Sequence, residues 1–331
     1  MTLPPTPPAT PEPSRRGLAT LMLLGSCASW GLSFPLMRAY NIAIAERMPE
    51  AAKLFGPAWS LTLRFAGSAL LMLAWLAWRG QLSALTRLER NQGLFLGVFT
   101  AAGMLLQCDG LNRTHATTSA FLTQCYCIFV PAWVAFRSRR LPAARVMVAA
   151  LLVMIGVGIL AGLDLHTLQL GLGEWETIGA SAVFTAQILC VERPAFAGNR
   201  PLPVSCLAFA ACAAFLLPVA LATAPGAHQL VQAVAEPSLA LCLLALTLVS
   251  TLLGMVLMFT WQRHLEATAA ALIYGCEPLF ASAFAFVLPG LLAGALGIAY
   301  ANERFTPSLV IGGALIIGAN VLVQLRPQAQ R

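Results

Sequence analysis

The chain has 331 residues, of which 59% are hydrophobic and 10% are charged, and its mean hydropathy is +0.78. A soluble domain averages about 25% charged residues, so this composition excludes a soluble monomer and indicates an integral membrane protein. The net charge of +7 does not indicate a nucleic-acid-binding protein, because the arginines stand in small groups between apolar runs and form no single patch.

Apolar runs long enough to cross a bilayer recur along almost the whole chain. Before them, six prolines within residues 2–13 predict a disordered cytoplasmic tail over residues 1–16. A membrane helix needs about 20 apolar residues. We therefore predict ten spans, at residues 18–38, 57–78, 92–111, 115–136, 145–163, 174–192, 203–223, 238–262, 267–288 and 307–325. The uncharged run of the sixth span, at residues 177–191, is short for a membrane helix.

The arginine distribution predicts the orientation of these spans. With the N-terminus inside, the inner loops and tails receive fourteen basic residues and the outer loops receive five, while Arg64 falls within a span. Inner loops of membrane proteins are enriched in Lys and Arg. The sequence therefore predicts a multi-pass protein of the cell (inner or cytoplasmic) membrane with both termini cytoplasmic.

The two halves of the chain resemble each other. The stretch "HATTSAFLTQCYCIFVP" (115–131) is echoed by "EATAAALIYGCEPLFA" (266–281), and "RRLPAARVMVAALLVMIGVGIL" (139–160) by "ERFTPSLVIGGALIIGANVLV" (303–323). Five spans per half is an odd number, so the second half must enter the membrane upside down. We therefore expect an all-α protein made of two inverted five-helix repeats, 17–163 and 171–325, followed by a cytoplasmic tail, 326–331. Secondary transporters of this plan bind their solute near the midplane.

Several stretches resemble the drug/metabolite transporter superfamily, in its ten-helix EamA-type branch. They include "ASWGLSFPLMRA" (28–39), "LTLRF" (61–65), "AFLTQCYCIFVPAW" (120–133), "GEWETIGASAVFTAQILCVER" (173–193), "WQRHLEATAAALIYGCEPLFA" (261–281) and "ERFTPSLVIGGALIIGANVL" (303–322). The resemblance implies a permease that exports small metabolites. The family's Gly-Glu pair after the fourth and ninth spans is replaced here by "SRR" (138–140) and by "NER" (302–304), the latter after an insertion at 289–301. We expect this insertion to extend the ninth span or to lie along the outer interface.

Glu277 and Pro278 interrupt the most apolar part of the chain. Pro278 cannot donate to the carbonyl of Tyr274, so the ninth helix is predicted to kink there. Glu277 lies eleven residues after Glu266, which places it about 16 Å along the helix and near mid-depth. A charged carboxylate at that depth costs about 2.5–3.5 kcal/mol. Two interpretations stay open: Glu277 binds a proton or a substrate amine in a cavity, or it satisfies backbone groups freed by the kink.

Arg64 is the second ionisable residue inside a predicted span, about 10 Å from its outer end. It could extend outward to the interface, or pair with Asp109 or Glu277. If it faces a cavity instead, it would attract a carboxylate and favour amino or organic acids as solutes.

Amide and aromatic side chains inside the spans are the remaining candidates for a binding site. We expect about half of them to line a cavity for a small amphipathic solute and the others to pack between helices or lie at the interface; they are Trp30, Gln107, Gln124, Tyr126, Gln187, Trp261 and Tyr274.

Other protein classes are not supported by the sequence. It contains no H-E-x-x-H, G-x-S-x-G or Walker motif, so we expect neither an enzyme nor ATP-driven transport. The nine cysteines form no zinc or disulfide pattern, and no metal or cofactor is expected. Glycine pairs at 158 and 162 and at 290 and 294 permit close helix contact and a homodimer. We predict a permease that exports amino acids or related solutes by alternating access, with proton coupling through Glu277 as a hypothesis. The alternatives are an intramembrane lipid-modifying enzyme and a non-transporting membrane partner or sensor.

Overall fold

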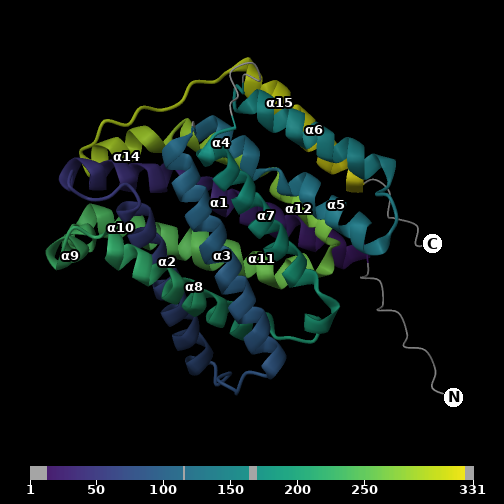
Figure 1. The fold of residues 1–331 in the computed structure, drawn as a ribbon, viewed down its shortest axis with the longest axis horizontal. Coiled ribbons are helices and arrows are strands. Elements are labelled where there is room, and N and C mark those ends of the chain that lie inside the picture. The colour runs from purple at the N-terminus through teal and green to yellow at the C-terminus, as the bar shows by residue number, and fades with distance from the viewer. Residues whose placement is uncertain (1–12, 115, 164–169, 325–331) are drawn as a thin grey trace.

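The computed structural model describes residues 13–114, 116–163 and 170–324, and every regular element in those ranges is a helix (Figure 1). The elements of the first half are α1 (Pro13–Arg47), α2 (Phe55–Trp78), α3 (Arg87–Arg113), α4 (Ala116–Thr123), α5 (Tyr126–Ser138) and α6 (Ala144–Leu160). Those of the second half are α7 (Leu172–Glu192), η1 (Pro194–Phe196), α8 (Pro201–Thr223), α9 (Ala227–Ala235), α10 (Pro237–Ala245), η2 (Leu246–Leu253), α11 (Gly254–Trp261), η3 (Gln262–His264), α12 (Ala267–Tyr274), α13 (Glu277–Ala285), α14 (Leu288–Leu296) and α15 (Pro307–Gln324).

One helix or a run of successive helices lies at each of the ten predicted spans. Within the described residues, seven of them are long and apolar enough to cross a membrane. The other three are α6 and α15, which are apolar but shorter, and α7, which carries three glutamates. The all-helical membrane class is therefore confirmed, whereas ten crossings stay a prediction.

The start of the chain differs from the prediction. Helix α1 extends from Pro13 to Arg47, so it includes the end of the predicted tail and half of residues 39–56, which lie between the first two predicted spans. The rest of that tail and the final tail, 326–331, lie outside the described residues.

Large apolar side chains are exposed around the bundle, with Trp78 79% exposed and Phe136 76% exposed. Such a surface fits a lipid environment and not water.

The predicted insertion forms a helix of its own. The ninth span ends at Ala285, and α14 follows it and packs against α1 and α10. The same end of the bundle holds α9, whose carbonyls accept hydrogen bonds from the Tyr40 hydroxyl (3.1 Å) and the Trp59 indole (3.2 Å). Arg47 joins α9's flank to α14, because it pairs with Glu236 (2.6 Å) and donates to the Leu296 carbonyl (2.8 Å).

The helices of the two halves interleave. The most extensive packing joins α2 with α8, α3 with α7 and α8, and α6 with α15, and Figure 1 shows α6 and α15 side by side at the upper right. In the same view the start of α1 and the end of α15 both lie on the right. Buried aromatic rings fill the α2–α8 contact, where the Phe65 and Phe209 ring centroids are 6.0 Å apart.

Glycines allow the closest helix approaches. A Cβ on Gly312 would lie 2.5 Å from the Gly156 carbonyl oxygen, and a Cβ on Gly156 would lie 2.7 Å from the Gly312 carbonyl oxygen. The backbones of α6 and α15 are therefore in direct contact, as small residues permit in membranes. The predicted pair Gly158 and Gly162 does not make this contact, since Gly162 follows the end of α6 at φ 62°.

Replacing Gly312 with leucine should force α6 and α15 apart. We expect Gly312→Leu to lower the free energy of unfolding by at least about 1–3 kcal/mol, the usual cost of overpacking a tight contact. Thermal unfolding of the purified protein in detergent measures the change. Gly318→Leu is the control, because a Cβ at that position would meet no neighbouring helix or side chain within 4 Å. Equal melting temperatures for the two variants would contradict the assignment of this contact.

Candidate functional site

A cavity of about 150 Å³ lies inside the bundle. Its wall is mostly apolar, with a few polar and ionisable side chains, which is the usual character of a small-molecule site. The lining residues come from α1, α2, α3, α4, α5, α7, η2, α11, α12 and α13; they are Trp30, Ser33, Phe34, Met37, Leu61, Arg64, Phe65, Thr100, Met104, Gln107, Cys108, Thr123, Tyr126, Phe184, Gln187, Ile188, Ser250, Thr251, Met255, Met258, Tyr274 and Glu277.

Two helices break at the cavity. Helix α12 ends at Tyr274 and α13 begins at Glu277, with Pro278 in its first turn, so the predicted interruption at Pro278 is confirmed. Helix α4 ends at Thr123 and α5 begins at Tyr126, which was not predicted, because no proline stands at that point. The repeat offered the missing signal, since it aligns Cys125 with Cys276 and so places the two breaks at equivalent positions. Both breaks supply lining residues on each side.

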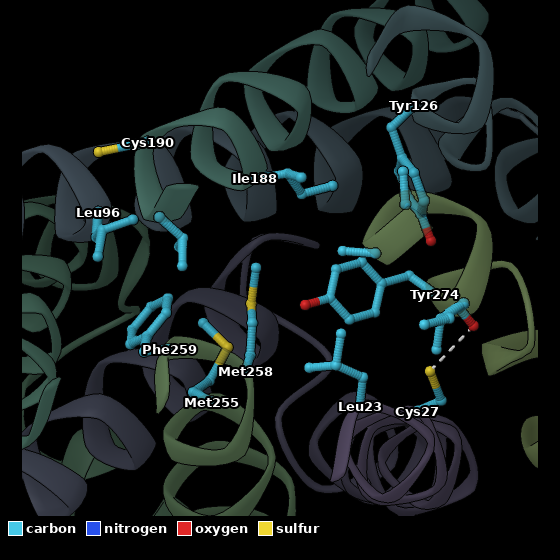
Figure 2. Close-up of a cluster of buried hydrophobic side chains, with 14 of the residues drawn as sticks. Leu23, Cys27, Leu96, Tyr126, Ile188, Cys190, Met255, Met258, Phe259 and Tyr274 are labelled. Atoms are coloured by element: carbon cyan, nitrogen blue, oxygen red, sulfur yellow. Dashed lines mark hydrogen bonds between the residues drawn. The ribbon is translucent and has the colours of Figure 1, made fainter. Parts of the chain in front are cut away.

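The carbonyl groups ahead of the second break have side-chain partners from other helices. The Cys127 thiol of α5 donates to the Ala271 carbonyl (3.2 Å), and the Cys27 thiol of α1 donates to the Ile273 carbonyl (3.4 Å; dashed line in Figure 2). The Asn320 amide of α15 donates to the Leu272 carbonyl (3.1 Å). Sequence reasoning did not select Asn320, although it is a polar residue within the tenth predicted span.

Glu277 stands in the first turn of α13 and lines the cavity. Among the described residues it has no ion-pair partner and no hydrogen bond to the backbone freed at the break. A carboxylate in the first turn of a helix is stabilised, because the N-terminus of the helix carries partial positive charge. The geometry thus places Glu277 toward the cavity, while the carbonyls of Ala271, Leu272 and Ile273 have other partners.

Arg64 also lines the cavity and is only 3% exposed, so it does not reach outward to the interface. The alternative pairing with Asp109 is wrong as well. Asp109 pairs with Arg113 one helical turn later (3.0 Å), while Arg64 donates through Nε to the Thr251 hydroxyl (3.0 Å). No carboxylate of the described residues forms an ion pair with Arg64, and its Nη1 has no hydrogen-bond partner there.

The remaining candidates divide between the cavity and the surrounding packing. Trp30, Gln107, Tyr126, Gln187 and Tyr274 line the cavity, whereas Gln124 is buried beside it without lining it. Trp261 instead packs against the ring of His264, with the ring planes tilted by 53° and the centroids 5.7 Å apart. These placements agree with the expectation that only part of the set would face the cavity; a binding role for any of them stays a prediction.

The aromatic wall is held in place from behind. The Trp30 and Tyr274 ring centroids are 5.3 Å apart, and the Tyr274 hydroxyl donates to Gln262 Oε1 (2.9 Å). The Gln262 amide in turn donates to the Ile188 carbonyl (2.7 Å). Figure 2 shows Tyr126 and Tyr274 on the right of this cluster, with Met255, Met258 and Phe259 of α11 to the left. A fixed wall of this kind presents the same face to every solute that enters.

Polar side chains close the bundle at the end where α3 begins. Arg200 pairs with Glu89 (2.7 Å), which raises the pKa of the Arg200 guanidinium through the hydrogen bond between them. Arg263 donates to the Asn199 carbonyl (3.0 Å), and the Asn199 amide donates to Gln92 Oε1 (2.8 Å). These contacts connect the start of α3 with the η1–α8 segment and η3. The cavity begins beyond them, and its α3 residues, from Thr100 to Cys108, lie toward the opposite end.

Comparison with known proteins gives similarities to membrane transporters. The EamA-like transporter family matches residues 17–162. An "Uncharacterized transporter" from Archaeoglobus fulgidus is 24% identical over 313 residues, covering 94% of this chain and 85% of the relative. The match over residues 17–162 and this relative support membership of the drug/metabolite transporter superfamily.

The chain also shares its fold with a solved structure. A protein known from a crystal structure matches with a TM-score of 0.67 at 17% identity, covering 93% of this chain and 97% of the other. At that identity the match supports the fold alone. The family match and the apolar helices support a multi-pass membrane protein of the transporter class.

Asn320 should be needed for the second break. Replacing it with alanine removes the side-chain hydrogen bond to the Leu272 carbonyl, which keeps its bond from the Gly275 N–H, and one such hydrogen bond contributes about 0.5–1.5 kcal/mol. We therefore expect Asn320→Ala to lower the melting temperature measurably in nanodiscs.

The control for this substitution is Ile317→Ala, which changes an exposed side chain on the same helix. If the two variants melt at the same temperature, Asn320 does not support the break.

Proposed function

We propose that this transporter exports small amphipathic metabolites, with amino acids and related compounds as the leading class, by alternating access across the cytoplasmic membrane. The observation that carries the proposal is a mostly apolar cavity between two broken helices, lined also by a few polar and aromatic side chains. In inverted-repeat transporters, discontinuous helices supply free backbone and helix ends to a solute site near the midplane. Here both breaks, at 124–125 and 275–276, adjoin one cavity.

The helix contacts support two structurally equivalent halves. The first five predicted spans correspond in order to the last five, so α2 is the counterpart of α8 and α6 is the counterpart of α15. If counterparts are exchanged, the α2–α8 and α6–α15 contacts map onto themselves. The α3–α7 contact maps onto the contact of α1 with η2 and α11, which is also extensive. A structure with this exchange symmetry can reverse the roles of its halves, which is the basis of alternating access in many transporters.

The closed end supports a state in which the cavity is shut off from one side. In the predicted orientation, the contacts of Arg200 with Glu89 and of Arg263 with Asn199 lie on the cytoplasmic side. Several of the positively charged loops meet there, as the positive-inside rule requires. Opening this end would break those contacts, and closing the opposite end would complete the cycle.

Glu277 is proposed to carry the coupling proton. It is a carboxyl group in an apolar cavity without a cationic partner among the described residues, so its proton affinity can respond to the access state. No ATP-binding motif is present, and the energy would come from an ion gradient or from the gradient of the solute.

Replacing Glu277 with glutamine should remove any dependence of transport on a pH gradient while leaving the protein folded. Efflux from proteoliposomes loaded with labelled metabolites, measured with and without the gradient, tests this. Glu46→Gln, which neutralises an exposed carboxylate, is the control and should keep the wild-type response. A gradient response that survives in Glu277→Gln would rule out the coupling role.

The same assay on the wild-type protein tests the proposal as a whole. Selective efflux of one chemical class identifies the solute and supports a permease. If no class leaves the vesicles, the alternatives return, namely a lipid-modifying enzyme in the membrane or a non-transporting partner or sensor.

A further inference from the structure

Three buried polar atoms around the cavity have no hydrogen-bond partner among the described residues. They are Arg64 Nη1, Ser250 Oγ and Gln187 Oε1. The side chains are 3%, 1% and 4% exposed, respectively, and all three residues line the cavity. Buried polar groups in proteins are nearly always hydrogen-bonded, so each exception calls for an explanation such as a ligand.

Arg64 is hydrogen-bonded to a segment of unusual helix geometry. Residues Leu246–Leu253 form a π-helix, a rare geometry that is frequent at functional sites. Ser250 and Thr251 of this segment both line the cavity. Thr251 accepts the Arg64 Nε hydrogen bond at 3.0 Å, which fixes the guanidinium against η2. Nη1 is thereby left unpaired on the same wall as the Ser250 hydroxyl.

We propose that this wall, formed by α2 and η2, is a carboxylate subsite in which Arg64 Nη1 and the Ser250 hydroxyl both donate to the solute. Arginine binds carboxylates through directed, charge-assisted hydrogen bonds. Among the described residues one cation lines the cavity, so a monoanion matches its charge and a phosphate dianion does not. The carboxylate also supplies the anion that Arg64 lacks inside the protein.

Two other residues that line the cavity distinguish acids from amino acids. Glu277 and Gln187 Oε1 are acceptors that also line the cavity, and they suit an ammonium group. The carboxylate is therefore required for binding and the amino group is an addition to it. This inference rests on the proposed transport function and names the substrate class of its site.

A matched ligand series tests the subsite on the full-length protein in nanodiscs. The probes are monocarboxylates of graded chain length and leucine, each beside its chain-matched primary amine or amino alcohol. We expect the carboxylates and leucine to raise the melting temperature and the matched compounds without a carboxylate to have little effect. Stabilisation by the amines equal to that by the acids, or stabilisation by none of the acids, would overturn the subsite.

Two substitutions link the effect to this wall. Ser250→Ala should weaken carboxylate binding about tenfold, which corresponds to one hydrogen bond to a charged group. Arg64→Lys should weaken it further, because a lysine cannot reproduce the guanidinium geometry. Ser181→Ala is the control, since Ser181 is also fully buried and unpartnered but does not line the cavity. Equal carboxylate affinities in Ser250→Ala and the wild type would contradict the assignment.

The series separates this inference from the transport function. Efflux of amines or neutral solutes, without binding of any carboxylate, would overturn the subsite and leave transport standing. Carboxylate binding that depends on Ser250 and Arg64, without efflux of any compound, would support the subsite and overturn the transport proposal.

Discussion

A hydrocarbon environment supplies no hydrogen bonds, so a helix that breaks inside the membrane must find partners for its backbone within the protein. The break between α12 and α13 meets this requirement through three other helices. Thiols from α1 and α5 and the Asn320 amide from α15 partner the carbonyls of Ile273, Ala271 and Leu272. The break is thus a supported feature of the fold, and the cavity forms beside it.

Glu277 takes no part in these hydrogen bonds and lines the cavity. Arg64 is in a similar position on another wall, where Thr251 fixes one face of the guanidinium and leaves Nη1 unpaired. Opposite charges that line one cavity without pairing to each other suit a solute that carries its own charge. Close glycine contacts such as Gly156 with Gly312 give the bundle its compact helix packing.

The sequence predicted the features that follow from composition and local chemistry. The all-helical class and the interruption at Pro278 come from apolar runs and from the missing proline donor, and both were confirmed. The break at 124–125 was missed because it has no proline, and the π-helix was missed because it leaves no marker in "LTLVSTLL". The hydrogen bond between Arg64 and Thr251 was not predicted either, because it depends on how α2 and η2 pack. Contacts between distant segments decide such details.

The central claim is that solute passes through the cavity between the two broken helices. Its most direct test is efflux of a labelled metabolite mixture by Met104→Trp, which would fill the cavity from α3, beside Leu94→Trp on the exposed side of the same helix. The account predicts that Met104→Trp stays folded and loses efflux while Leu94→Trp keeps it. Undiminished efflux by a folded Met104→Trp protein would show that the solute takes another path.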